Sequence, residues 1–242
     1  MIALIYHRVG GRSPSPVDLP VAMFRDQLDE LAATGRVVGL DTALDRLGEP
    51  AHADGGALDV VLTFDDGTAD WADVVVPELE SRRLPATFYV ATAFVESRRG
   101  WPDEGRPVSW AALAEVVGSG VAGVGSHTHS HRVLATVDAA ETTDEIDRSI
   151  GLIEDHLGVA CRHFAYPNAV AGSPAAEVVV RRRFASAALA GNRVNVSGRT
   201  DAHRLGRHGL TVADRTEDFA RKVAGGGWLE GWLRERRDAG RF

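Results

Sequence analysis

Apolar residues follow two patterns that alternate along the chain. Short continuous runs rich in β-branched residues predict buried strands, and apolar residues that recur every three or four positions predict helices. The order strand, helix, strand is repeated about six times, which predicts an α/β fold with a mainly parallel sheet, either open or closed into a barrel. The predicted strands are 2–6, 59–64, 86–91, 121–126, 161–167 and 185–190. The predicted helices are 20–35, 68–82, 109–120, 142–158, 173–184 and 228–239.

Several helix ends carry local signals. Pro20 suits a first helical turn and Gly35 suits a helix end, while Ser109 and Ser173 are typical N-caps. Pro77 lies inside a predicted helix, where its missing N–H is unfavourable. Polar connections are expected at 92–108 and 191–203.

Composition restricts the class of protein. The 242 residues suit one domain, which we expect to span 1–242 with a catalytic core over about 1–212. A net charge of −7 argues against binding to nucleic acid or to an anionic membrane surface. No apolar run reaches transmembrane length, and the first residues lack the basic leader of a signal peptide. The sequence therefore predicts a cytoplasmic protein if Met1 is the native start.

Candidate catalytic residues stand at the ends of four predicted strands, in the stretches LIYH, LTFDDG, GSHTHSH and FAYPNA. Active-site residues of parallel α/β proteins collect at these carboxyl ends. Neighbouring strand residues point to opposite faces, so Asp65 and Asp66 can face one way only if the strand breaks there, which Gly67 permits. Alone, an Asp-Asp-Gly sequence is more typical of a turn and a helix cap.

His127 and His131 are four positions apart, and a helical turn after Ser126 would place both rings on one face. With Asp66 they form a set of two histidines and one carboxylate, which leaves positions open for water and substrate on a catalytic metal. Asp65 is then a spare carboxylate beside the metal's water, the position of a general base. His129 is expected to face solvent. For the histidine pair alone, the alternative is a polar loop.

With these residues the sequence resembles the polysaccharide deacetylases of carbohydrate esterase family four. The first family motif, Thr-Phe-Asp-Asp-Gly, is intact at 63–67, and the second, His-Ser/Thr-x-x-His, is matched at 127–131. The resemblance implies a distorted (β/α) barrel of about seven parallel strands without full closure, which hydrolyses an N-acetyl or O-acetyl group of a sugar or glycan. It also implies a general base at Asp65 and a divalent metal, usually Zn²⁺ with Co²⁺, Ni²⁺ or Mn²⁺ as alternatives. The implied metal ligands are Asp66, His127 and His131.

The third motif departs from the usual Phe-Arg-x-Pro-Tyr-Gly and reads Phe-Ala-Tyr-Pro-Asn-Ala at 164–169. This version, with Tyr-His-Arg at 6–8, resembles the branch that includes deacetylases of poly-N-acetylglucosamine. The arginine that braces the catalytic aspartate is missing. This branch usually carries an arginine after a Leu-Pro pair, and Arg204 and Arg207 fall at the corresponding place, in HRLGRHGL. We expect Arg207 to reach Asp65 and keep it ionised, the alternative being a solvated surface arginine. The backbone N–H of Asn168 is expected to serve an oxyanion hole.

The family's late Leu-x-His motif, which supplies the general acid, has no clear copy near the C-terminus. Because circular permutation would move that motif to the first strand, we expect His7 to be the general acid, with His208 as second choice. A structural histidine at a strand end is the alternative for His7. Trp71 and Tyr166 are expected to pack in the core.

Two other functions fit the same residues. One is a metal-dependent hydrolase of a non-sugar amide or other C–N bond in a small-molecule pathway. The other is a lapsed enzyme that binds carbohydrate, for which Asn168 and the missing arginine are the reasons. The connection 92–108, which contains Trp101, could form part of a substrate groove. The sequence leaves the metal, the substrate length, the choice between amide and ester, and the oligomeric state open.

Overall fold

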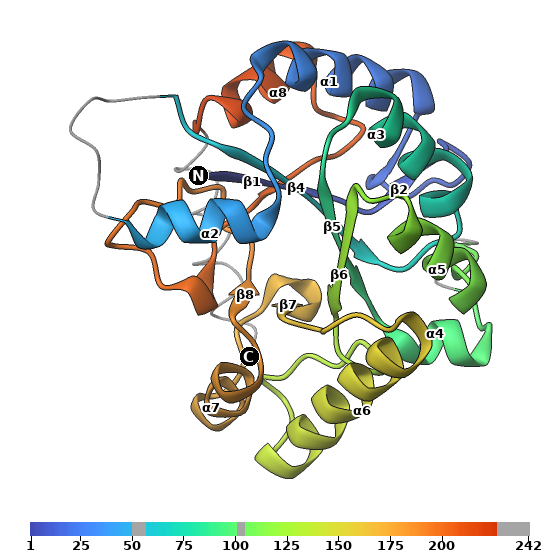
Figure 1. The fold of residues 1–242 in the computed structure, drawn as a ribbon, viewed down its shortest axis with the longest axis vertical. Coiled ribbons are helices and arrows are strands. Elements are labelled where there is room, and N and C mark those ends of the chain that lie inside the picture. Colours follow the sequence, from blue (N-terminus) through green and yellow to red (C-terminus); the bar gives the residue numbers. More distant parts are fainter. Residues whose placement is uncertain (50–56, 101–104, 227–242) are drawn as a thin grey trace.

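A computed structural model describes residues 1–49, 57–100 and 105–226 (Figure 1). Its centre is a seven-stranded sheet, in the order β8-β7-β6-β5-β4-β1-β9, in which every pair of neighbours is parallel. The sheet is curled into a half-barrel with helices around it, as predicted. The strands are β1 (Ile2–Tyr6), β4 (Val60–Asp66), β5 (Ala86–Val90), β6 (Ala122–Ser126), β7 (His163–Ala165), β8 (Ser186–Ala188) and β9 (His208–Gly209). A separate parallel pair joins β2 (Arg8–Val9) and β3 (Asp18–Leu19).

The segment 205–209 contacts both ends of this strand order. Leu205 forms a parallel bridge with Ala188 of β8, and His208 of β9 pairs with Leu4 of β1. The last strand therefore lies at the seam of the curled sheet, where a side chain from it can reach residues of the central strands. This seam was not predicted, because β9 has only two residues and no apolar run.

Helices cover the outer face of the sheet, and α2 lies near the N-terminus of the chain (Figure 1). The buried Leu40, Ala43 and Leu47 of α2 belong to the same apolar cluster as Ala3 of β1 and Val61 of β4, and Asp41 lies 3.2 Å from the His163 ring of β7. The helices are α1 (Val21–Thr34), α2 (Leu40–Gly48), α3 (Val76–Arg82), α4 (Thr92–Ser97), α5 (Trp110–Gly118), α6 (Ala139–Leu157), α7 (Pro174–Arg183) and α8 (Thr216–Val223).

Capping residues set the helix ends much as expected. Gly35 ends α1 in the left-handed conformation (φ 62°), and the hydroxyls of Ser109 and Ser173 accept hydrogen bonds from the first turns of α5 and α7. Pro77 changes the helix predicted at 68–82. The chain forms a π-helical turn over Trp71–Val75 before α3, because the proline ring and its missing N–H are incompatible with the regular α-helical ladder.

Three short helices were missed by the sequence analysis. The region 92–108, expected to be a polar connection, begins with α4, and neither α2 nor α8 was predicted. All three are shorter than the three turns over which a helical period can be recognised in a sequence. The C-terminal helix predicted at 228–239 and the residue Trp101 lie outside the described residues.

The two faces of the sheet have different side chains. Large apolar residues pack outward against the helices, where Phe64 stacks on Tyr6 at 5.1 Å and on Phe88 at 4.9 Å between ring centroids. This stack fixes β1, β4 and β5 relative to one another. Because strand side chains alternate, the same register turns Thr63 and Asp65 to the inner face of the curl.

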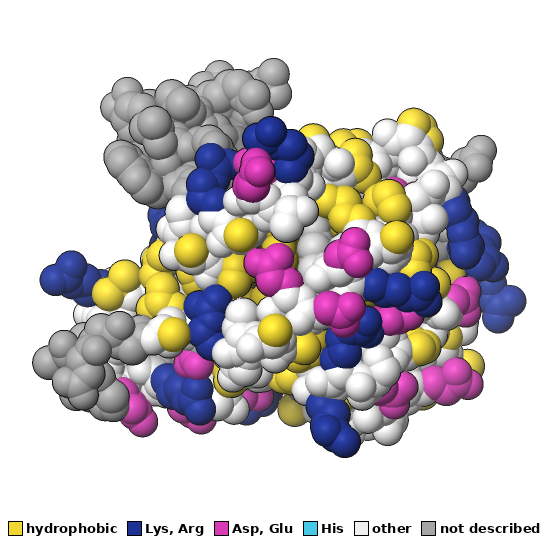
Figure 2. Space-filling model, turned by 90° about the horizontal axis from the view of Figure 1, so that it is seen from above, with side chains coloured by type: hydrophobic (Ala, Val, Ile, Leu, Met, Phe, Trp, Pro, Cys, Tyr) yellow, Lys and Arg dark blue, Asp and Glu magenta, His cyan; other side chains and the backbone are white. Residues whose placement is uncertain are grey.

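Acidic and basic side chains lie interspersed on the face seen in Figure 2, with no broad patch of one sign. Trp71 and Tyr166 are 0 % and 1 % exposed, which confirms that both pack in the core. Among the described residues, no helix combines the length and the apolar character needed to cross a bilayer.

Candidate active site

Polar residues from several strands meet at the carboxyl edge of the sheet. Asp65 and Asp66 end β4, His7 directly follows β1, and His127 directly follows β6. Parallel strands β1, β4, β5 and β6 are neighbours in the sheet, so these ends lie along one edge. Three of the four strand ends that the sequence analysis selected thus lie along this edge, and His131 joins them from the loop that follows β6.

The backbone breaks at Asp66. Its φ of 90° is unusual for a residue with a side chain, and Gly67 follows with a φ of 108°. The alternation of the strand is lost at this point, so the Asp66 carboxylate turns toward the histidines while Asp65 stays on the inner face. The strand ends at Asp66, and Gly67 has the positive φ that the sequence analysis considered possible there. Strained backbone of this kind concentrates at functional sites.

Asp66, His127 and His131 form a cluster suited to a divalent cation. One ligand atom from each lies within 4.8 Å of the others. Asp66 Oδ1 is 3.7 Å from His127 Nε2 and 3.5 Å from His131 Nε2. Ligands about 2.0–2.1 Å from a tetrahedral Zn²⁺ are separated by about 3.3–3.4 Å, so the observed spacing needs little change. The donor set and its spacing therefore fit a borderline divalent ion.

The loop that carries the two histidines is not helical, contrary to the expected helical turn. Thr128 and His131 instead adopt left-handed backbone conformations, with φ of 64° and 61°, and these bring the two rings to a centroid distance of 4.9 Å. His129 does not face solvent as expected. It is 8 % exposed, and its Nδ1 lies 2.8 Å from the Thr92 hydroxyl of α4. The histidine that does not join the cluster thus anchors the loop to a neighbouring helix.

The His127 ring is held in a defined tautomer. Its Nδ1 lies 2.7 Å from the carbonyl oxygen of Ala165, which can only accept, so Nδ1 donates and Nε2 presents its lone pair to the cluster. Burial lowers the pKa of His127, although the charges of Asp65 and Asp66 oppose this. Burial, reinforced by His127, lowers the pKa of His131 to about 4. Both rings are neutral at pH 7, as metal ligands must be.

Asp65 and Arg207 form a buried, bidentate ion pair. Both N–O distances are 2.7 Å, and the two residues are 4 % and 1 % exposed. Burial alone would raise the pKa of Asp65, but the Arg207 guanidinium, with smaller contributions from His127 and His7, lowers it to about 2. The structure thus brings the expected arginine to Asp65 from a position 142 residues away.

Two further contacts of Arg207 fix its position. The Nε atom donates to the Leu189 carbonyl at 2.8 Å, and one terminal nitrogen also donates to the Thr63 hydroxyl at 3.0 Å. The guanidinium lies 5.4 Å from the centroid of the Tyr89 ring. Every one of these partners is in the inner face of the curl, so Arg207 is a built component of the site and not a solvated side chain.

Glu145 was missed by the sequence analysis. This residue of α6 is 8 % exposed, and its carboxylate accepts both the N–H and the hydroxyl of Ser130, at 2.7 and 2.6 Å. It therefore holds the histidine loop one residue before His131. A signal was available, because Thr142, Glu145 and Ser149 recur at helical spacing beside the apolar stripe of α6 and all three are buried.

The remaining predicted residues occupy different surroundings. His7 is partly buried, and its charge lowers the pKa of both Asp65 and His131, so its ring lies within electrostatic reach of the cluster. Its Nδ1 is buried without a hydrogen-bond partner among the described residues. Asn168 is exposed just after β7, with a φ of 54° in a 3₁₀ turn.

His208 is turned away from these residues. It neighbours Arg207, whose side chain is on the inner face, so strand alternation sends His208 to the outer face. There it is 0 % exposed, and burial, with a smaller effect of the Lys222 charge, lowers its pKa to about 4. The structure does not bring this second candidate for the general acid to the cluster.

Comparisons with known proteins agree with this arrangement. The chain is similar to the solved structure of IcaB from Ammonifex degensii, with 29 % identity, coverage of 95 % of this chain and 96 % of that one, and a TM-score of 0.78. The fold alone is shared with the deacetylase PplD from Streptococcus pyogenes, at 19 % identity, 92 % and 97 % coverage and a TM-score of 0.78. A de-N-acetylase from Aggregatibacter actinomycetemcomitans matches the fold at 18 % identity, 91 % and 98 % coverage and a TM-score of 0.76.

No curated protein sequence matches the chain. A family model described as polysaccharide deacetylase matches residues 53–182, more than half of the chain, and this range includes Asp65, Asp66, His127 and His131. The chain therefore belongs to the polysaccharide deacetylase family, whose members are enzymes that remove acetyl groups from carbohydrates.

Proposed function

We propose that this protein is a divalent-metal-dependent deacetylase that hydrolyses the N-acetyl group of an N-acetylglucosamine-containing glycan. Family membership supports the sugar deacetylase activity. The similarity to IcaB and the Phe-Ala-Tyr-Pro sequence at 164–167 support a glycan of this kind. One observation carries the proposal most strongly: the buried, ionised Asp65 directly precedes the metal-type ligand Asp66, so a proton acceptor and a cation site are adjacent.

Asp66, His127 and His131 would hold the ion. Bound there, a divalent ion supplies Lewis-acid activation of water and of the acetyl carbonyl. Two neutral imidazoles and one carboxylate leave coordination positions open, which distinguishes a catalytic site from a closed structural one. Imidazole and carboxylate together favour Zn²⁺, Co²⁺, Ni²⁺ or Mn²⁺ over Ca²⁺, which prefers oxygen ligands.

Asp65 is the proposed general base. Its pKa of about 2 keeps it ionised at neutral pH, so it can accept the proton of the attacking water. Arg207 serves as a positioning residue, because its two hydrogen bonds fix both carboxylate oxygens while neutralising their charge. Such a low pKa makes Asp65 a weak base, which is adequate only for a water that the site has made more acidic.

His7 is the proposed general acid. An amide anion is a very poor leaving group, so the departing nitrogen must receive a proton as the C–N bond breaks. His7 lies within electrostatic reach of Asp65 and His131, and the buried Nδ1 without a protein partner is consistent with a ring that works on a ligand. The backbone N–H of Asn168 is proposed to donate to the oxyanion that forms on the acetyl carbon.

Acetate release tests the proposal. We expect release from N-acetylglucosamine oligomers, no release from cyclic amides, and at least a hundredfold lower kcat for Asp65→Asn. Asp26→Asn is the matched control, because Asp26 is an exposed aspartate of α1. Absence of release from the oligomers, in protein resupplied with each of the four candidate metals, would refute the proposed activity. Equal rates in Asp65→Asn and Asp26→Asn would refute the role of Asp65.

A further inference from the structure

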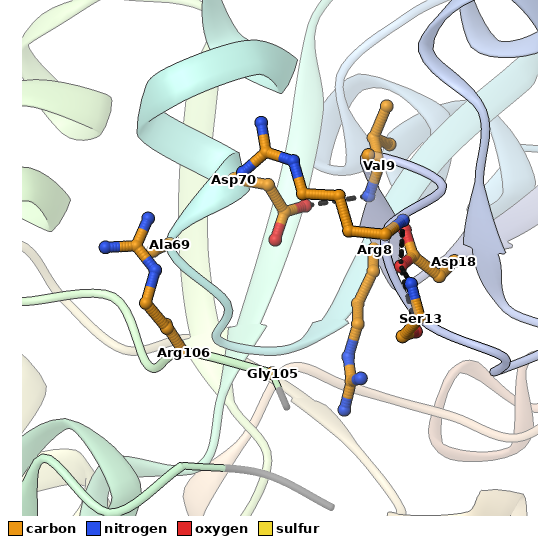
Figure 3. Close-up of a pocket in the computed structure, with 10 residues that line it drawn as sticks. Arg8, Val9, Ser13, Asp18, Ala69, Asp70, Gly105 and Arg106 are labelled. Carbon is orange, nitrogen blue, oxygen red and sulfur yellow. Dashed lines mark hydrogen bonds between the residues drawn. The ribbon is translucent and has the colours of Figure 1, made fainter. Parts of the chain in front are cut away.

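The backbone beside His7 is held by two residues that follow the Asp-Asp-Gly motif of β4. The indole Nε1 of Trp71 donates a hydrogen bond to the carbonyl oxygen of His7 at 3.1 Å. The Asp70 carboxylate accepts the N–H of Val9 at 2.8 Å, in the wall of a pocket of about 190 Å³ (Figure 3). The chain is thus fixed on both sides of Arg8, directly after the proposed general acid.

The position of the His7 ring depends on this backbone. Its Nδ1 is buried without a hydrogen-bond partner among the described residues, so no contact at that atom orients the ring. His7 also lies between β1 and β2 and belongs to neither strand. A general acid must come within hydrogen-bond distance of the leaving nitrogen, and an error of about 1 Å can lower the rate about a hundredfold.

Trp71 is itself held firmly. It is fully buried, and its ring lies 4.9 Å from that of Phe88 between centroids. It begins the π-helical turn Trp71–Val75, in which the N–H of Val76 donates to the Trp71 carbonyl, and turns of this type are frequent at functional sites. Apolar packing alone does not require an indole, because a phenylalanine ring also fills a core. The indole adds a buried N–H that needs an acceptor, and His7 supplies it.

The segment that joins the motif to Asp70 and Trp71 is anchored as well. Thr68 forms an antiparallel bridge with Pro107, and the N–H of Val108 donates to the Gly67 carbonyl at 2.9 Å. The acid and the base act on different atoms around the scissile bond, so their separation has to match the substrate. One short, anchored segment therefore carries the proposed base and also holds the backbone of the proposed acid.

We propose that Trp71 and Asp70 are positioning residues, which fix the backbone at His7 so that its ring meets the leaving nitrogen of the amide. Both act through His7 and not on the substrate. The inference rests on the proposed function, and in particular on the role of His7. It predicts a loss that depends on the leaving group, because an amine must be protonated as it departs and 4-nitrophenolate need not be. A general weakening of the fold would slow both reactions alike.

Acetate release from an N-acetylglucosamine oligomer is compared with hydrolysis of 4-nitrophenyl acetate. Trp71→Phe retains a ring but removes the N–H donor, so we expect kcat to fall about tenfold for the amide and less than about twofold for the ester. Asp70→Ala removes the acceptor at Val9 and should have the same effect. Asp70→Asn retains an acceptor oxygen and should keep the wild-type ratio of the two kcat values. Asp70→Ala decides the question if Trp71→Phe does not fold.

Two further variants separate positioning from packing. Phe184→Leu is the packing control, because Phe184 is a buried aromatic residue that stacks on Phe164 and directly precedes the strand that begins at Ser186, at the end of the sheet opposite to the site. It should lower the free energy of unfolding without changing the ratio of amide to ester kcat. In a His7→Gln background, Trp71→Phe should lower this ratio no further, because the two residues act as one unit.

The outcomes distinguish this inference from the proposed function. An unchanged ratio in either Trp71→Phe or Asp70→Ala, or a further tenfold fall of the ratio in the His7→Gln background, would overturn the inference and leave the proposed function standing. A wild-type protein that releases no acetate from the oligomer would contradict both. A selective loss of amide hydrolysis in the two variants, with no further loss in the His7→Gln background, would support both.

Discussion

Replacement of Arg207 by methionine tests how the site keeps its base ionised. The variant removes four hydrogen bonds, two to Asp65 and one each to Thr63 and Leu189, and leaves the Asp65 carboxylate buried without a counter-charge. Removal of one partner of a buried pair costs about 3–5 kcal/mol, mostly because the remaining charge is uncompensated. We expect Arg207→Met to lower the free energy of unfolding by this amount at pH 7.

The double variant Arg207→Met, Asp65→Asn separates the lost charge from the lost packing. With no carboxylate left to desolvate, it should be more stable than Arg207→Met alone by about 1–3 kcal/mol. Urea unfolding at pH 7, with an unchanged dependence on denaturant, measures both values. Arg207→Lys should also lose stability, since an ammonium group cannot bind both carboxylate oxygens in the planar fork.

Enzyme kinetics supply the second measurement. Without Arg207, burial is opposed only by the smaller effects of His127 and His7, so the pKa of Asp65 should rise from about 2. A base must be ionised to act. As the pH is lowered, kcat/KM of Arg207→Met should therefore begin to fall at a higher pH than kcat/KM of the wild type. Unchanged stability and kcat in Arg207→Met, or a double variant whose loss equals the sum of the two single losses, would refute this reasoning.

Three further results are expected. His7→Gln should lower kcat about a hundredfold for an N-acetyl substrate but at most about tenfold for 4-nitrophenyl acetate, and equal losses would contradict the assignment. Glu145→Ala should weaken the affinity for a divalent ion about tenfold in a buffered metal titration, because it removes the hydrogen bonds that hold the histidine loop at Ser130. Asp155→Ala, at an exposed position of the same helix, should leave the affinity unchanged, and equal affinities of the two variants would count against this role. The pKa of His208 is lowered to about 4 in the folded protein, so the unfolded chain binds an extra proton between pH 6.5 and 4. The free energy of unfolding should therefore fall by up to about 1.4 kcal/mol for each pH unit as the pH is lowered through this range. Urea unfolding at several pH values should show a smaller pH dependence for His208→Gln, and an unchanged dependence would contradict this role.

Much of the fold follows from local patterns. The strands that supply the site have strong local signals, such as the β-branched run that becomes β4. The seam is different. The segment 205–209 becomes part of the sheet only because β1 and β8 offer free edges to it, and such a long-range pairing leaves no periodic pattern in the sequence.

The site also has a part that the sequence predicts and a part that it does not. Asp65, Asp66, His127 and His131 stand in short motifs whose spacing already indicates a metal centre. The conformation of the histidine loop was predicted incorrectly, because its shape depends on left-handed residues and on contacts from other elements. Those contacts come from Thr92 on α4 and from Glu145 on α6, which are distant in sequence.

The contact of Arg207 with Asp65 was predicted from the family resemblance and not from a local sequence pattern. Spacing alone does not connect it to Asp65, and the expectation came from the arginine that this branch of the family carries near that position. The structure supplies what the sequence lacks, namely the geometry of a bidentate contact and the burial of both partners. The face on which a strand residue lies also separates Arg207 from its neighbour His208, a distinction that requires the register of β9.

Metal content tests the central claim most directly. Purified protein is stripped with a chelator, resupplied in turn with Zn²⁺, Co²⁺, Ni²⁺ and Mn²⁺, desalted and analysed for bound metal. We predict about one ion per chain in the wild type, and far less in Asp66→Asn, His127→Gln and His131→Gln, each of which removes one proposed ligand. A wild-type protein that retains none of the four ions, or variants that retain as much metal as the wild type, would contradict the account.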